Sequence, residues 1–278
     1  MSVSRRSALI NVMVRAAEKA ARGLSRDFGE VENLQVSRKG PGDFVSAADT
    51  RAEEVLKEEL SKARPQFGFL MEESGEEKGQ DPDRRWIVDP LDGTNNFLHG
   101  IPYWAISIAA EEKGKISAAV VYEPVSGDLY WAERGNGAYL NSRRMECSRR
   151  EKLENCMIGT GLPACRIERK ERDLFQAELD VMMPQVSGLR RLGSAALDLC
   201  WVASGRFDGF WDRNLSPWDI AAGSLIVSEA GGVFTDINMG QNNIYTGEAL
   251  AANGSIHKEL RQLISKAGTM HKKEKAVS

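Results

Sequence analysis

The sequence predicts a layered protein of the α+β or α/β class, and three observations support this fold class. Helical spacing of apolar residues and short apolar runs alternate along both halves of the 278-residue chain, which is typical of helices packed on sheets. The chain has no internal repeat. The apolar run Trp86–Val88 leads directly into two carboxylates, Asp89 and Asp92, and the carboxyl end of a strand is where α/β proteins place their ligands.

Composition and charge indicate an ordinary globular protein and argue against some kinds of partner. Hydrophobic residues make up 42% of the chain and charged residues 28%, as in ordinary globular proteins. The net charge of −3 gives no sign of a nucleic-acid-binding surface, so nucleic acid is not expected as a partner. No apolar run approaches the roughly 18 residues of a membrane span. Arg5 and Arg6 faintly resemble a twin-arginine signal, but Arg15, Glu18 and Lys19 break the apolar region that would have to follow.

The cysteine pattern agrees with a cytoplasmic location. The chain has four cysteines and no Cys-x-x-Cys pair, so reduced thiols are expected rather than a disulfide or zinc framework. We therefore expect a cytoplasmic protein without a membrane segment. The cysteines are Cys147, Cys156, Cys165 and Cys200.

Elements of the first half follow from local patterns. Apolar residues recur at helical spacing from Leu9 to Phe28, and a second helix is expected after Asp49, where Thr50 and Glu53 have the spacing of a capping box. A charged loop is expected over 76–85. Short apolar runs bounded by turn residues predict strands at 67–71, 86–88, 105–110, 116–122 and 129–133.

The second half alternates strands with helices. The polar and basic stretch 141–153 is the candidate boundary, so we expect one domain over 1–266, built from subdomains of about 1–146 and 147–266, and a disordered tail over 267–278. Ser194 is expected to cap one helix, and Ser216-Pro217 to start another. Strands are expected at 156–160, 188–192, 207–211, 233–235 and 250–252, and helices at 168–182, 194–205, 216–231 and 255–266.

The two carboxylates after Trp86–Val88 are candidate metal ligands. Asp89 and Asp92 are three residues apart across a turn at Pro90, so their side chains can converge on one point. Two like charges about 4 Å apart repel by roughly 4 kcal/mol at an effective dielectric near 20, unless a cation lies between them. Oxygen-only ligands suit a hard ion such as Mg²⁺. The alternative is a solvated turn, because Asp, Pro and Gly are ordinary turn residues.

Other acids lie at comparable positions, and each has an alternative interpretation. Glu72 and Glu73 follow the expected strand 67–71, although Glu73 also fits a solvated rim. Asp219 lies in the first turn of its helix, where the helix dipole alone favours an acid by roughly 0.3–1 kcal/mol. Asp49 is also explained by a helix start.

Two expected helix starts offer backbone N–H groups to an anion. Gly93-Thr94 follows the Asp89–Asp92 segment, and Gly193-Ser194-Ala195 follows the expected strand at 188–192. Each could be a plain capped helix end. Beside a carboxylate cluster, however, both starts suggest metal-assisted hydrolysis of a phosphoester.

These segments resemble the signature motifs of the inositol monophosphatase family. The resemblance spans roughly residues 8–266 and implies a layered αβαβα sandwich of the inositol monophosphatase and fructose-1,6-bisphosphatase type, a homodimer, and inhibition by lithium. The matching segments are 39–49, 72–75, 86–97, 193–199 and 218–223.

The resemblance also implies roles for individual residues. Glu72, Asp89 and the Leu91 carbonyl would bind the first Mg²⁺, and Asp92 and Asp219 would complete a site of two or three ions. Thr94, oriented by Asp49, would help to activate the attacking water, with Glu73 in the same catalytic group. The amides of Gly93 and Thr94 would hold the phosphate, and Lys39 would lie on a mobile loop. The groups facing the ring hydroxyls would be Asp92, Gly193, Ala195 and Asp212.

The implied reaction is Mg²⁺-dependent hydrolysis of a small sugar-like phosphate monoester, with myo-inositol 1-phosphate as the leading substrate. The family usually has Glu where this chain has Asp212, whose shorter side chain puts the inositol contact in doubt. Fructose 1,6-bisphosphate and a 3′-phosphorylated nucleotide are alternative substrates. A scaffold role in the transcription machinery is an alternative of another class.

Overall fold

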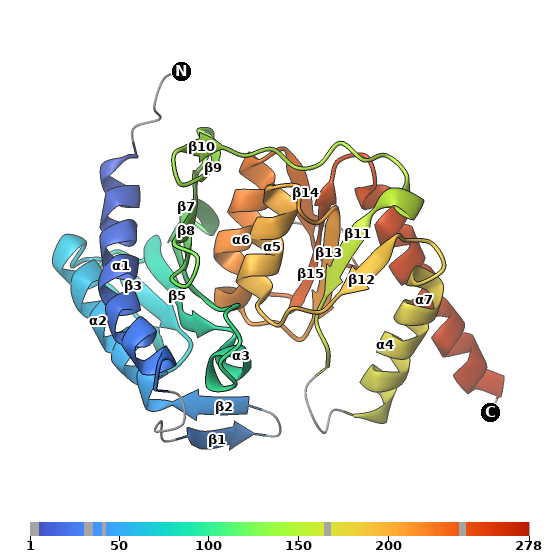
Figure 1. Cartoon of the computed structure of the whole chain (residues 1–278), viewed down its shortest axis with the longest axis horizontal. Coiled ribbons are helices and arrows are strands. Elements are labelled where there is room, and N and C mark those ends of the chain that lie inside the picture. The colour runs from blue at the N-terminus through green and yellow to red at the C-terminus, as the bar shows by residue number, and fades with distance from the viewer. Residues whose placement is uncertain (1–5, 31–35, 41–42, 164–167, 239–242, 278) are drawn as a thin grey trace.

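The chain folds into five layers in the order helix, sheet, helix, sheet, helix (Figure 1). The computed structural model describes residues 6–30, 36–40, 43–163, 168–238 and 243–277. The layered αβαβα sandwich expected from the sequence is therefore confirmed. No helix in these ranges combines the length and the apolar composition needed to cross a membrane.

Two helices, α1 (Ala8–Phe28) and α2 (Ala47–Ala63), form the first outer layer. The Ser7 hydroxyl caps α1 by accepting a hydrogen bond from the Ile10 N–H at 3.2 Å, and the helix then buries one apolar face. The second helix begins at Ala47, so Asp49 lies in its first turn and Thr50 is not an N-cap. The predicted capping box is wrong because β2 leads directly into the helix, and Glu53 instead binds the backbone of Glu73.

The second layer is an eight-stranded sheet with the strand order β10-β9-β8-β7-β6-β5-β3-β4. Its pairs are antiparallel except for β3 with β5, and successive hairpins build most of it. The strands are β3 (Gly68–Met71), β4 (Gly75–Glu77), β5 (Arg84–Asp92), β6 (Ala105–Glu112), β7 (Lys115–Glu123), β8 (Asp128–Glu133), β9 (Gly137–Leu140) and β10 (Arg143–Arg144).

Several short strands have no counterpart in the prediction. The first two, β1 (Val36–Gly40) and β2 (Asp43–Ser46), form a separate hairpin, and β4, β9 and β10 extend the large sheet. They are polar or glycine-containing, so they lack the alternation of apolar residues by which a half-buried strand is recognised.

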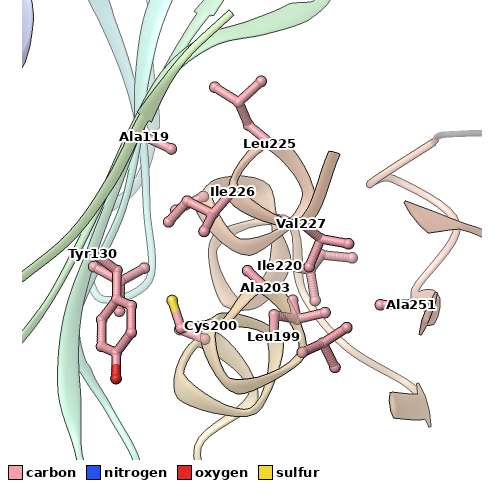
Figure 2. Close-up of a cluster of buried hydrophobic side chains, with 14 of the residues drawn as sticks. Ala119, Tyr130, Leu199, Cys200, Ala203, Ile220, Leu225, Ile226, Val227 and Ala251 are labelled. Atoms are coloured by element: carbon pink, nitrogen blue, oxygen red, sulfur yellow. The ribbon is translucent and has the colours of Figure 1, made fainter. Parts of the chain in front are cut away.

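The middle layer consists of α5 (Ala195–Ala203) and α6 (Pro217–Glu229), which are apolar on nearly every side. Such helices are stable only between two apolar surfaces. Figure 2 shows Ala119 and Tyr130 of the large sheet on one side of this pair and Ala251 of the small sheet on the other. One continuous core thus joins both halves of the chain.

The small sheet and its outer helices complete the sandwich. Its order is β12-β11-β13-β15-β14, with β12, β11 and β13 parallel. The outer helix α7 (His257–Val277) extends beyond Lys266, so the tail predicted to be disordered is helical as far as Val277. The remaining elements are α3 (Thr94–Leu98), η2 (Leu153–Asn155), β11 (Met157–Thr160), α4 (Arg169–Met182), β12 (Gly188–Arg190), β13 (Gly209–Arg213), β14 (Gly232–Thr235) and β15 (Glu248–Asn253).

Gly223 tests the close packing of the middle layer. A Cβ atom at this position would lie 2.4 Å from Cδ1 of Leu199 on α5. We expect Gly223→Ala to lower the free energy of unfolding by about 1–3 kcal/mol, because α5 and α6 must move apart. Urea denaturation measures this change.

The control is Gly23→Ala on α1, where a new Cβ has no atom within 4 Å. We expect this variant to gain about 0.5–1 kcal/mol, since alanine is the better helix former. Equal stability of the two variants would contradict the packing argument.

Candidate active site

The site is built on the end of β5, which is the third strand from one edge of the large sheet. The strand continues to Asp92 rather than ending at Val88 as predicted, and a β-bulge separates Asp89, opposite Ser107, from Asp92, opposite Ala105. A bulge bends the strand and re-aims its side chains. The Leu91 N–H donates to Asp89 Oδ1 at 2.9 Å, which fixes the first carboxylate in this bend.

The helix α3 follows immediately, as predicted. Gly93 caps it with φ of 93°, a left-handed conformation that favours glycine, and a Cβ there would lie 3.0 Å from the Tyr103 carbonyl oxygen. The Thr94 hydroxyl donates to the Leu91 carbonyl at 2.9 Å. The candidate nucleophile-activating hydroxyl is therefore held beside the candidate metal-ligating carbonyl.

Asp92 joins the two halves of the site. Its Oδ2 accepts hydrogen bonds from the Ser194 hydroxyl at 2.5 Å and from the Ala196 N–H at 2.7 Å. Burial raises the pKa of Asp92 to about 6, although these donors and the N–H groups of Ala195 and Gly93 act in the opposite direction. Ser194 is the N-cap of α5, as predicted, but the N–H donors that it was expected to offer to a phosphate bind Asp92.

Four carboxylates, which we call the carboxylate cluster, interact electrostatically: Glu72, Asp89, Asp92 and Asp219. Burial raises the pKa of Asp89 well above its ordinary value, and the negative charges of the other three raise it further. Asp219 behaves in the same way for the same physical reasons. The structure thus brings together the acids that the sequence analysis proposed as metal ligands.

Asp219 also has the structural role that was its alternative interpretation. It lies in the first turn of α6, and its Oδ2 accepts the Ser216 N–H at 2.7 Å. Glu72 follows β3 directly, and its N–H donates to the Val88 carbonyl at 3.3 Å. Three elements therefore bring the four acids together: β5 carries Asp89 and Asp92, Glu72 follows β3, and Asp219 lies on α6.

The cluster fits a hard cation by its chemistry. Its donors are carboxylate oxygens together with the Leu91 carbonyl, which is the set that Mg²⁺ prefers. A cation among them would remove the mutual repulsion that raises the pKa values of Asp89 and Asp219. Within the described ranges, no three His, Cys, Asp or Glu side chains converge to enclose an ion as they stand. Asp89, Asp92 and Asp219 turn oxygens toward protein donors instead.

Asp212 lies at the end of β13, near this cluster. Burial raises its pKa to about 7, while the Arg213 N–H and the charge of Arg191 act in the opposite direction. Its carboxylate lies against Gly161, where a Cβ would come within 1.9 Å of Asp212 Oδ2. Gly161 therefore leaves the space that the Asp212 side chain occupies.

The remaining predicted residues are placed as follows. Asp49 is buried in the first turn of α2, and its interaction with Thr94 stays a prediction. The Glu73 N–H donates to Glu53 Oε2 at 2.8 Å, so α2 holds the Glu72-Glu73 turn. Lys39 lies in the strand β1 rather than in a loop, and its side chain is outside the described part of the structure.

Comparisons with known proteins agree with this geometry. The model of the inositol monophosphatase family matches residues 5–269. An inositol-1-monophosphatase of Mesorhizobium japonicum is 56% identical over 261 residues, which cover 94% of this chain and 97% of that protein. The Nus factor SuhB of Escherichia coli strain K12 is 40% identical over 255 residues, covering 91% of this chain and 94% of that protein.

A solved structure gives the same result for the fold. The crystal structure of the extragenic suppressor protein suhB from Bartonella henselae matches with a TM-score of 0.89 and 54% identity, over 94% of this chain and 99% of that one. Fold and family match together define a phosphatase of a class that is generally metal-dependent. The chain belongs to the inositol monophosphatase family, which confirms the predicted family and enzyme class.

The raised pKa values make stability depend on pH and on metal. An acid whose pKa is higher in the folded state than in the unfolded state keeps its proton up to a higher pH when the protein is folded. Stability is therefore lost as pH rises from the unfolded value of 3.8 through the folded value, which is about 6 for Asp92. We expect the melting temperature in EDTA to fall between about pH 4 and 7, and Mg²⁺ at pH 7.5 to restore it.

Thermal melts in EDTA and in Mg²⁺ over this pH range check the expectation. Because Mg²⁺ binds the ionised cluster, its effect must shrink toward pH 4, which serves as the internal control. Identical melting temperatures with and without Mg²⁺ at pH 7.5 would refute a shared cation site.

Proposed function

We propose that this phosphatase hydrolyses the phosphate monoester of a small polyol, with myo-inositol 1-phosphate as the leading substrate and two or three Mg²⁺ ions as cofactors. The observation that carries the proposal is the carboxylate cluster beside the starts of α3 and α5. The relative named an inositol-1-monophosphatase at 56% identity supports the choice of substrate.

The cation would be held by the carboxylate cluster and the Leu91 carbonyl. When bound, Mg²⁺ neutralises the phosphate, lowers the pKa of a nearby water molecule and stabilises the leaving oxygen. The protein must hold these acids close together although they repel one another. It does so through the β5 bulge at Asp89 and the backbone donors that bind Asp89, Asp92 and Asp219.

Thr94 and its helix start would act on the phosphate and the water. The Thr94 hydroxyl donates to Leu91 and retains acceptor capacity for a water proton. In the proposed mechanism the hydroxyl turns its own proton from the Leu91 carbonyl to the Asp49 carboxylate, which accepts it as the hydroxyl oxygen takes the proton of the water. The amides of Gly93 and Thr94 at the start of α3 would hold the phosphate oxygens, as helix starts do for anions.

The leaving polyol would lie between the start of α5 and the end of β13. Asp92, Gly193, Ala195 and Asp212 would face its hydroxyls there. A carboxylate accepts hydrogen bonds from hydroxyl groups well, but the Asp212 side chain is one methylene shorter than glutamate. We therefore propose weak discrimination among small polyol phosphates.

A second role is favoured by one observation, the 40% identity to the Nus factor SuhB of Escherichia coli strain K12. This relative supports an interaction role in transcription as an alternative or additional function. A homodimer and inhibition by lithium belong to the proposal as well. A pull-down with the Asp92→Asn variant would separate an interaction role from catalysis.

The substrate proposal is tested with a panel of purified esters. Release of phosphate from myo-inositol 1-phosphate, fructose 1,6-bisphosphate, a 3′-phosphorylated nucleotide and glycerol 2-phosphate is measured with Mg²⁺, and folded Asp92→Asn serves as the inactive control. The highest kcat/KM on myo-inositol 1-phosphate is the expected result. A higher value on another ester would replace the substrate, and no hydrolysis of any ester would overturn the proposed function.

Thr94→Ala separates water activation from binding. General base assistance is typically worth about 10²–10⁴-fold, so we expect kcat to fall in this range. KM should change much less, because backbone amides and the cofactor hold the phosphate. Steady-state kinetics measure both constants, and Thr94→Ser is the control that keeps the hydroxyl. A rise in KM at unchanged kcat would make Thr94 a binding residue.

Asp212→Glu tests the contact with the polyol. The added methylene would let the carboxylate reach a ring hydroxyl directly, and a direct hydrogen bond to a charged group is worth about 1.5–3 kcal/mol. We expect the ratio of kcat/KM for myo-inositol 1-phosphate over glycerol 2-phosphate to rise on the order of tenfold. An unchanged ratio would show that residue 212 does not contact the ring.

A further inference from the structure

The Asn96 side chain links the two helix starts of the site. Asn96 lies within α3 and is only 5% exposed. Its Nδ2 donates to the Tyr103 carbonyl at 2.7 Å and to the Leu192 carbonyl at 2.8 Å. Leu192 is 96 residues away in sequence and immediately precedes Gly193, so one amide group joins the α3 segment to the α5 segment.

Two glycines make this link close. Gly193 has φ of 95°, and a Cβ there would lie 3.1 Å from Asn96 Nδ2. On the other side, a Cβ at Gly93 would lie 3.0 Å from the Tyr103 carbonyl oxygen, which is also an acceptor of Asn96. The Asn96 amide group is therefore packed against Gly193 and bonded to the Tyr103 carbonyl, which itself lies close to Gly93.

A second hydrogen bond spans the same two segments. The Tyr103 hydroxyl donates to Asp198 Oδ1 at 2.8 Å, and Asp198 lies in the first turn of α5. The segment 96–104 is therefore bound to the α5 segment twice, at the Leu192 carbonyl and at the Asp198 carboxylate. Asp92, by contrast, reaches α5 through a carboxylate that the proposed catalysis needs.

We propose that Asn96 is a positioning residue that sets the distance between the phosphate-holding start of α3 and the polyol-holding start of α5. The inference rests on the proposed function for the identity of the two ligand groups. A substrate that contacts both starts depends on their separation. A substrate whose only strong contact is its phosphate depends on α3 alone.

The experiment compares Asn96→Leu with Asn95→Leu, which places the same side chain on the exposed neighbouring position of α3. Asn96→Ala removes both amide hydrogen bonds without adding bulk and replaces Asn96→Leu if that variant does not fold, and Tyr103→Phe removes the second link. For each protein, kcat/KM is measured for myo-inositol 1-phosphate and for p-nitrophenyl phosphate. Amide hydrogen exchange of segment 191–197 is measured in parallel, without substrate.

We expect Asn96→Leu to lower the ratio of kcat/KM for myo-inositol 1-phosphate over kcat/KM for p-nitrophenyl phosphate at least about tenfold. We also expect it to speed amide hydrogen exchange in segment 191–197. Tyr103→Phe should change the ratio and the exchange rate in the same direction but less. Asn95→Leu should change neither the ratio nor the exchange rate. A general loss of stability would lower both specificity constants together. An unchanged ratio with unchanged exchange in folded Asn96→Leu, or in Asn96→Ala where the leucine variant does not fold, overturns the inference.

The failure of the proposed function has a different signature. If the wild-type protein hydrolyses neither ester, the proposed function is wrong, and the exchange of 191–197 alone decides whether Asn96 fixes the two segments.

Discussion

Repulsion among the carboxylates of the cluster is the constraint on which the rest of this structure depends. Burial and neighbouring negative charge both raise the pKa values of Asp89 and Asp219, so the chain itself disfavours the ionised form of its own site. At an effective dielectric near 20, two like charges about 4 Å apart repel by roughly 4 kcal/mol. Acids on flexible segments would move apart. Here they are carried by the end of β5, the end of β3 and the first turn of α6, which the core fixes in place.

The layered fold partly offsets the repulsion among the carboxylates. The starts of α3, α5 and α6 all face the acids, and the N–H groups at a helix start carry partial positive charge. The apolar middle layer of α5 and α6 makes this possible, because two helices buried between sheets can direct their first turns at one edge without losing core contacts. The αβαβα order is therefore linked to the chemistry of the site, because the small sheet covers the face of α5 and α6 that the large sheet leaves open.

The sequence predicted most helices and the longer strands, because their apolar residues repeat with a clear period. The acids Asp89, Asp92 and Asp219 could be proposed because each follows or begins a recognisable element. Glu53 was misinterpreted, because it has the spacing of a capping box with Thr50, whereas its partner is the Glu73 N–H, 20 residues away. Asn96 carried no local signal, since a buried asparagine whose acceptors come from two segments becomes visible only after folding.

Ser194 shows why the candidate helix starts could not be fully assigned from the sequence. It caps α5 as predicted, with the Leu197 N–H donating to its Oγ at 3.3 Å, yet the same hydroxyl donates to Asp92. A single oxygen therefore serves helix stability and the carboxylate cluster. Both bonds that Asp92 accepts from Ser194 and Ala196 end on Oδ2, and neither occupies Oδ1. Asp92 therefore ties the carboxylate cluster to the α5 start, and the Asn96 link to Leu192 joins the same segment without using a carboxylate.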